Sequence, residues 1–214
     1  HQPADSLPAI HIRPTVPLLA CQPAPKPKAP AKPKTPAKPK VSVTVDNVDE
    51  VYGSLTDDIA KEVFAAYGSP LAGNEKSLIS AFDAQNLSAW IGLAIIKEES
   101  SFANRANNPD LDERNEANPF SVHFNTDRKR WPKGCGKNLL LIEDNKKEYT
   151  PGETVKKECA AKGFRLPTFP ESAAGAAKTI KNKGFEAYRE KGGYKEVLNG
   201  HLRDMISKIK LEPK

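Results

Sequence analysis

The apolar positions of the chain follow the spacing of α-helices over most of its length. From residue 56 onward, apolar side chains repeatedly recur three and four positions apart, which is the period of one helix face. This spacing predicts helices that begin after Thr56, after Asn74 and near Ser88, and two later helices at residues 171–180 and 194–209. The pattern therefore predicts a mainly helical domain.

The helix that begins near Ser88 differs from the others because it is apolar on nearly all sides. Its apolar residues include Trp90, Ile91, Ile95 and Ile96. A helix of this kind belongs at the centre of a helical domain. It ends in an acidic pair, Glu98 and Glu99, and a carboxyl group beside such apolar side chains has a raised pKa because it is partly desolvated. This helix end is a candidate proton donor, as glycoside cleavage requires.

The middle of the chain departs from helical spacing. Residues 103–117 are almost all polar and predict a solvated loop, whereas residues 118–124 alternate in polarity and predict a strand. Residues 125–163 predict a short hairpin or an irregular lobe, and residues 41–45 alternate without an evident partner. The expected fold class is mainly α within an α+β arrangement, with a small β-containing lobe beside the helices.

The first forty residues have a different composition from the rest. Residues 22–40 alternate proline with lysine and alanine, so they cannot bury enough surface to fold. We expect a disordered, extended linker there. The chain then divides into an N-terminal tail (1–21), the Pro/Lys-rich linker (22–40) and one domain (41–214).

The net charge of +6 belongs to the tail and the linker. These two segments hold seven of the 33 basic residues and one of the 27 acidic residues, which leaves residues 41–214 formally neutral. The domain is therefore not expected to bind nucleic acid. The cationic linker either has no partner or contacts an anionic wall polymer or a membrane surface, and both interpretations stay open.

The three cysteines leave two questions open. Cys135 and Cys159 either form a disulfide in an oxidising compartment or stay separate thiols. Cys21 ends a short motif similar to a bacterial lipobox, although the residues before it lack the apolar stretch of a signal sequence. No cysteine or histidine spacing suits a metal or a catalytic triad, so no metal is expected and His201 is expected to have no role. No segment approaches the roughly 20 apolar residues of a membrane span.

Four segments, in order, resemble one known family. Residues 67–71 resemble its lead-in to the catalytic helix, 86–102 the catalytic helix itself, 118–123 its strand motif and 164–172 an aromatic segment before a late helix. Together they are similar to the bacterial glucosaminidase domains of autolysins and flagellar muramidases, within the lysozyme-like superfamily. Ser121 departs from this pattern, because the strand motif usually has glycine there.

The resemblance implies a lysozyme-like fold and a hydrolase that cleaves β-1,4 bonds between N-acetylated aminosugars of peptidoglycan glycan strands. It selects Glu99 rather than Glu98 as the general acid. It also places Tyr194 near the site, where this residue would position the substrate's acetamido group or stabilise positive charge at the anomeric carbon. A monomer outside the cytoplasm, secreted or associated with the cell envelope, is expected, and a phage lysin of the same chemistry stays open.

Four residues are expected to bind the substrate. They are Asn118, Phe120, His123 and Trp131. The amide of Asn118 suits an acetamido group, and the rings of Phe120 and Trp131 suit the flat faces of sugars, although core packing is an alternative for Phe120. No cofactor is expected, because proton donation and charge stabilisation suffice for this reaction.

The second catalytic group is an open question. A glycosidase usually needs a nucleophile or a base, and the polar loop offers candidates at Asp110, Asp112, Glu113 and Glu116. In some branches of the family the acetamido group of the substrate takes this role. A lytic transglycosylase, or a domain that binds wall glycan or a protein without catalysis, also fits the sequence.

Overall fold

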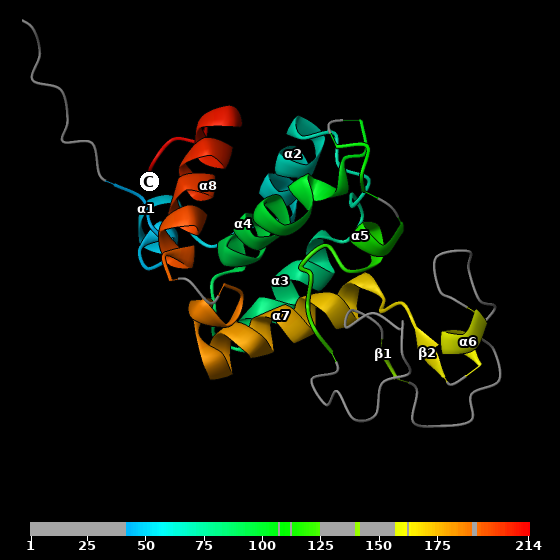
Figure 1. Cartoon of the computed structure of the whole chain (residues 1–214). Coiled ribbons are helices and arrows are strands. Elements are labelled where there is room, and N and C mark those ends of the chain that lie inside the picture. Colours follow the sequence, from blue (N-terminus) through cyan, green and yellow to red (C-terminus); the bar gives the residue numbers. More distant parts are fainter. Residues whose placement is uncertain are drawn as a thin grey trace, which may run out of the picture. The chain divides into compact units, whose positions relative to one another are not determined.

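The computed structural model describes most of the chain after residue 41 (Figure 1). The described residues are 42–106, 108–111, 113–124, 140–141, 157–161, 163–189 and 192–214. The chain divides into two units, His1–Pro39 and Lys40–Lys214, and all described residues belong to the second. The expectations for the tail, the Pro/Lys-rich linker, Cys21, Trp131 and Cys135 concern residues outside this description.

Helices make up most of the described structure, which confirms the mainly helical fold class. The bounds of the α-helices are α1 Val48–Tyr52, α2 Asp57–Ala66, α3 Glu75–Asp83, α4 Ala89–Ser100, α5 Glu113–Ala117, α6 Lys157–Ala160, α7 Phe169–Lys183 and α8 Tyr194–Lys208. Two short 3-10 helices, η1 Ser101–Ala103 and η3 Phe185–Ala187, follow α4 and α7. All the helices predicted from apolar spacing are present, as α2, α3, α4, α7 and α8.

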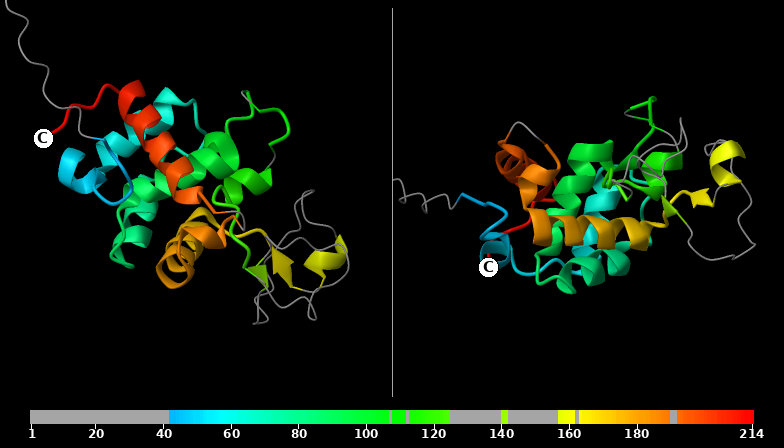
Figure 2. Two further views of the ribbon diagram at one scale, coloured as in Figure 1. Left: turned by 60° about the vertical axis from the view of Figure 1, so that its left-hand side comes forward. Right: turned by 60° about the horizontal axis from the view of Figure 1, so that its bottom comes forward.

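Helix α4 lies at the centre of the helical part. Every residue from 89 to 96 is buried, and helices α3, α7 and α8 pack around it, as Figures 1 and 2 show. The indole of Trp90 donates a hydrogen bond of 2.9 Å to the backbone oxygen of Gly53, which ties the chain after α1 to this core. A helix with no polar face is most stable when all its sides are covered, so its sequence explains its position.

Helix α7 begins with a tightly bonded carboxylate. Glu171 accepts hydrogen bonds from the backbone of Thr168 at 2.8 Å and from the guanidinium of Arg165 at 2.7 and 2.5 Å. The hydrogen bonds from Arg165 lower the pKa of Glu171 to about 2, against burial, which raises it. This arrangement satisfies free donors at the helix start and fixes the direction of α7.

The strand predicted at residues 118–124 does not form. Instead, the side chain of Asn118 closes a turn by accepting from the backbone of Val122 at 3.0 Å and donating to it at 2.9 Å. Ser121 has a φ of +50°, which an extended strand does not allow and which suits glycine, the residue of the resembled motif. Phe120 and Val122 are buried and His123 is exposed, so alternating burial arises here without strand pairing.

The described strands form one short antiparallel pair. Leu140 of β1 (Leu140–Leu141) lies opposite Arg165 of β2 (Phe164–Arg165). Helix α5 falls in the segment for which the sequence predicted a loop, and α1 was not predicted either, because helices of five residues show no repeating apolar spacing. Cys159 is disulfide-bonded. None of the helices in the described ranges is long and apolar enough to cross a membrane.

Gly92 permits the close contact between α4 and α3. A Cβ atom added there would lie 2.6 Å from Cδ1 of Leu78 and 2.7 Å from Cε2 of Phe82. We therefore expect Gly92→Ala to lower the free energy of unfolding by about 1–3 kcal/mol, because overpacking outweighs the better helix propensity of alanine. In Gly200→Ala, on α8, the nearest atom would lie 4.0 Å away, so this control should be neutral or stabilising. Urea denaturation measures both, and an equal gain in stability for the two variants would contradict the packing.

Candidate active site

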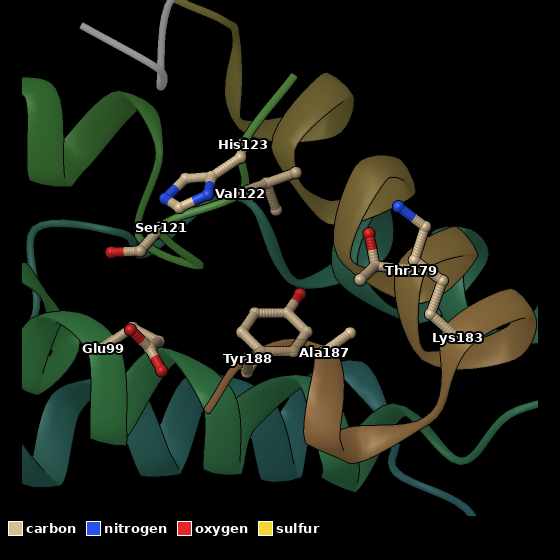
Figure 3. Close-up of a pocket in the computed structure, with 8 residues that line it drawn as sticks. All are labelled: Glu99, Ser121, Val122, His123, Thr179, Lys183, Ala187 and Tyr188. Atoms are coloured by element: carbon tan, nitrogen blue, oxygen red, sulfur yellow. The ribbon is translucent and has the colours of Figure 1, made fainter. Parts of the chain in front are cut away.

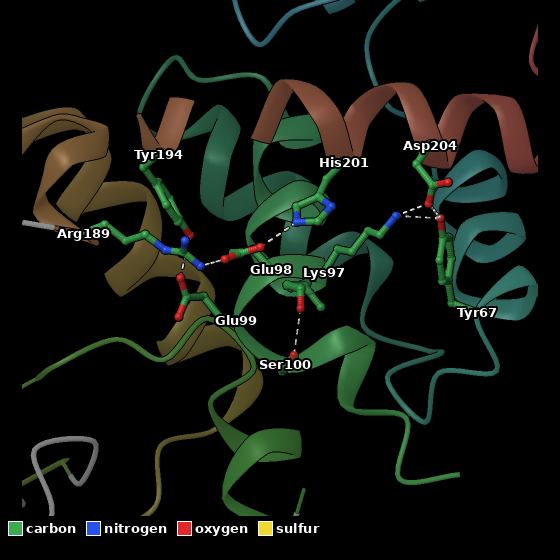
Figure 4. Close-up of polar contacts among 10 residues, drawn as sticks. Tyr67, Lys97, Glu98, Glu99, Ser100, Arg189, Tyr194, His201 and Asp204 are labelled. Atoms are coloured by element: carbon green, nitrogen blue, oxygen red, sulfur yellow. Dashed lines mark hydrogen bonds and ion pairs between the residues drawn. The ribbon is translucent and has the colours of Figure 1, made fainter. Parts of the chain in front are cut away.

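Three consecutive polar residues at the end of α4 each have a partner on α8 (Figure 4). The pairs are Lys97–Asp204, Glu98–His201 and Glu99–Tyr194. The partners follow in reverse order along α8, as expected for antiparallel helices, and their spacing of seven and three positions places them along one side of that helix. These contacts fix the end of α4 in both rotation and register.

Glu99 carries the half-buried carboxyl group at this helix end. Its Oε1 accepts a hydrogen bond of 2.7 Å from the hydroxyl of Tyr194, which is fully buried. Burial raises the pKa of Glu99 above its ordinary value of 4.5, and the hydrogen bond from Tyr194 lowers it in part. The C-terminal end of a helix also carries partial negative charge, which disfavours a carboxylate. Glu99 therefore keeps its proton to a higher pH than an exposed glutamate does.

The neighbouring Glu98 is held in ion pairs. Its carboxylate contacts the guanidinium of Arg189 and lies 2.7 Å from Nε2 of His201. Arg189 in turn lies over the ring of Tyr194, 5.6 Å from the ring centre. Glu98 thus contacts His201 and holds Arg189 in place next to Tyr194, the hydrogen-bond partner of Glu99. The contact of His201 with Glu98 could not be predicted from the sequence, because the two residues lie 103 positions apart and leave no local pattern.

The chain turns sharply after α4. Ser101, Phe102 and Ala103 have φ values of +48°, +60° and +53°, a left-handed run that costs roughly 1–2 kcal/mol per residue. The hydroxyl of Ser69 donates a hydrogen bond of 2.6 Å to the backbone oxygen of Phe102, whose buried ring packs on Tyr67. These contacts hold a turn that ends α4 beside Glu99. Backbone strain of this kind concentrates at functional sites.

Glu99 lies on the wall of a pocket of about 170 Å³ (Figure 3). The lining residues come from α4, the turn after residue 120, α7 and the segment around η3: Glu99, Ser121, Val122, His123, Thr179, Lys183, Ala187 and Tyr188. The volume is below the roughly 300–1,000 Å³ of pockets that enclose whole small molecules. Such a pocket suits one part of a longer ligand.

Tyr188 is a pocket residue that the sequence did not single out. Its ring stacks parallel to that of Tyr194 with centres 5.3 Å apart, so α8 also positions this side chain. Its hydroxyl is shielded from solvent and has no hydrogen-bond partner within the described ranges. Burial, and secondly the charge of Glu99, raise the pKa of Tyr188, so the phenol stays protonated. An unsatisfied buried hydroxyl costs roughly 1–3 kcal/mol.

The structure brings three of the predicted site residues together. Glu99 and His123 both line the pocket, and Tyr194 contacts Glu99 from behind. Because Tyr194 has no exposed surface and does not line the pocket, it cannot touch the substrate as predicted. It can position the acid. Trp131 lies outside the described residues.

The predictions that Asn118 and Phe120 bind substrate are wrong. The amide of Asn118 is 2% exposed, and its oxygen and nitrogen are both bonded to the backbone of Val122. Phe120 is fully buried against aromatic rings of α3 and α7, so no sugar can stack on it. Both residues instead shape the turn that presents residues 121–123 to the pocket.

Glu99 is the only carboxyl group among the pocket-lining residues of the described chain. Of the candidates for a second acid, Glu116 pairs with Arg105 at 2.8 Å and Asp110 is exposed in the loop. The side chains of Asp112 and Glu113 lie outside the description. The described part of the pocket therefore offers one carboxyl group that can act as a general acid and no second carboxylate that can act as a nucleophile.

Within the part of the chain that the structure covers, no three His, Cys, Asp or Glu side chains are grouped so that they could hold a metal ion. Comparison with known proteins finds no matching family model, no matching curated protein and no matching solved structure. Function must therefore be inferred from the residues of the site.

The Glu98–Arg189 pair should be coupled more strongly than the exposed Glu116–Arg105 pair. The side chain of Glu98 is 14% exposed and that of Glu116 is 39% exposed, so solvent screens the first pair less. Double-mutant cycles with glutamine should give coupling energies of about 1–3 kcal/mol for Glu98–Arg189 and below about 1 kcal/mol for the control pair. Chemical denaturation measures both cycles. Equal coupling energies would contradict a supporting role for Glu98.

Proposed function

We propose that this domain is a glycoside hydrolase that cleaves β-1,4 bonds between N-acetylated aminosugars in peptidoglycan glycan strands, with Glu99 as the general acid. The observation that carries this proposal is a half-buried carboxyl group with a raised pKa on a pocket wall. A general acid must hold its proton near neutral pH and reach the scissile bond. The ordered resemblance to bacterial glucosaminidases supports the same function, a lysozyme-like fold and a location outside the cytoplasm.

In the proposed reaction, protonated Glu99 gives its proton to the glycosidic oxygen as the C–O bond breaks. Burial favours the protonated form of Glu99 before the reaction. The hydroxyl of Tyr194 donates to Oε1 and stabilises the carboxylate that forms as the proton leaves. Tyr194 is thus a positioning residue that acts through Glu99.

The positive charge that develops at the anomeric carbon requires a second group. Since the described pocket contains no second carboxyl group, the acetamido oxygen of the substrate is the proposed nucleophile. The hydroxyl of Tyr188, which has no partner among the described residues, would donate a hydrogen bond to this acetamido group once ligand entry exposes it. This role for Tyr188 replaces the one that the sequence assigned to Tyr194.

Glu99→Gln should lower the rate of muropeptide release by about 100- to 10,000-fold, because glutamine cannot donate the proton. Glutamine keeps the size of the side chain and can still accept the hydrogen bond from Tyr194, so the fold should persist. Glu62→Gln, on the exposed side of α2, is the matched control and should keep full activity. Mass spectrometry of muropeptides released from purified peptidoglycan measures the rate and identifies the new end groups.

The products separate the remaining alternatives. Reducing ends indicate hydrolysis, and the identity of the terminal sugar distinguishes a glucosaminidase from a muramidase. Anhydro ends would indicate a lytic transglycosylase. Equal release by the wild type and Glu99→Gln would contradict the proposal, and binding to peptidoglycan without any release would identify a non-catalytic wall-binding domain.

A further inference from the structure

The pocket wall formed by α7 carries a cationic side chain. Lys183 and Thr179 lie one helical turn apart on α7 and line the pocket together, across from Glu99 (Figure 3). The ammonium group of Lys183 forms no ion pair or hydrogen bond within the described residues. Among the residues that line the pocket, His123 is the other side chain that can carry a positive charge. The hydroxyl of Thr179 donates to the backbone oxygen of Gly175 at 2.8 Å, so it can only accept from a ligand.

The charge balance of the pocket favours an anionic ligand group. Glu99 is uncharged when it holds its proton, which is its form before proton donation. The lining residues Ser121, Val122, Thr179, Ala187 and Tyr188 are also uncharged in that form. Lys183 then gives the pocket a positive charge without a compensating carboxylate among its lining residues. An ammonium group on a pocket wall is a natural partner for a carboxylate.

We infer that Lys183 is a specificity-determining residue that binds a carboxylate of the substrate, so that the domain prefers muramic-acid-containing glycan to neutral glycan. This inference rests on the proposed function. Muramic acid bears a lactyl group, whose carboxylate is free or is joined to a peptide stem with carboxylates of its own. Polymers of N-acetylglucosamine alone carry none of these groups, although the bonds between their sugars are also β-1,4.

Lys183→Met tests this inference directly, because methionine keeps an apolar stem of similar length and removes the charge. We expect its KM on peptidoglycan strands to rise about 3- to 10-fold with little change in kcat, as expected for loss of one partly exposed charge pair. On a neutral N-acetylglucosamine oligosaccharide, the same variant should behave as the wild type does. Lys183→Arg should restore the low KM, and Lys181→Met, an exposed residue of the same helix that does not line the pocket, should have no effect.

The source of the carboxylate is identified by a third substrate. Strands from which the peptide stems have been removed by an amidase keep the lactyl carboxylate. If Lys183→Met raises the KM on these strands alone, the free lactyl carboxylate is the ligand, and if it raises the KM on intact strands alone, a carboxylate of the stem is. If it raises the KM on both, Lys183 binds either carboxylate. Each of these results supports the inference. An equal effect of Lys183→Met on the charged and the neutral substrates, or no effect on any of them, would overturn it.

A binding measurement separates failure of this inference from failure of the proposed function. If the wild type releases no products, binding of a soluble muropeptide to the Glu99→Gln protein still measures the role of Lys183. Calorimetry should then show about 3- to 10-fold weaker binding when Lys183→Met is added to Glu99→Gln. Unchanged muropeptide binding in that double variant would overturn the proposal that Lys183 binds a carboxylate, whatever the outcome for catalysis.

Discussion

The site depends on the half-burial of one carboxyl group at the end of a fully buried helix. Helix α4 is covered on all sides up to residue 96, and its last turn emerges at the pocket, so Glu99 has core on one side and the pocket on the other. Because the folded-state pKa is raised above 4.5, folding favours the protonated form. This contribution to stability is lost as the pH rises from about 4.5 through the folded-state pKa. Above that range, the rest of the fold must hold Glu99 in place.

Helix α8 provides much of that support. It bonds three consecutive residues of α4 and carries Tyr194, whose ring stacks on Tyr188 and lies under Arg189. The acid, the residue that positions it and the unpartnered phenol therefore share one structural support. The strained left-handed turn at η1 completes the arrangement, because it ends α4 beside the pocket and directs the chain away from it. A displacement of α8 would move all these groups together.

Local sequence information sufficed for the helices and for the acidic end of α4. The helices were predictable because each has an apolar spacing and most have a polar residue at the start. The acidic pair at residues 98–99 was a candidate because an apolar helix ends there, but only the resemblance selected Glu99 over Glu98. The contacts of Glu98 with Arg189 and His201 were not predictable, since they join residues about a hundred positions apart. Tyr188 was missed for a similar reason: its place depends on stacking against Tyr194 and on the lack of a partner for its hydroxyl. The alternating polarity at residues 118–124 was misread as a strand, because a turn packed against α7 also buries Phe120 and Val122 and leaves His123 exposed.

The pKa of Glu99 tests this account most directly. Titration of its side-chain carboxyl carbon by NMR should give a value above the ordinary 4.5 in the wild type, because the group is partly desolvated. The value should rise further in Tyr194→Phe, which removes the hydrogen bond that favours the carboxylate. In Tyr67→Phe, whose lost hydroxyl bonds Asp204 instead, it should stay unchanged. A wild-type pKa at or below 4.5 would contradict the central claim that the fold favours the protonated form of this acid.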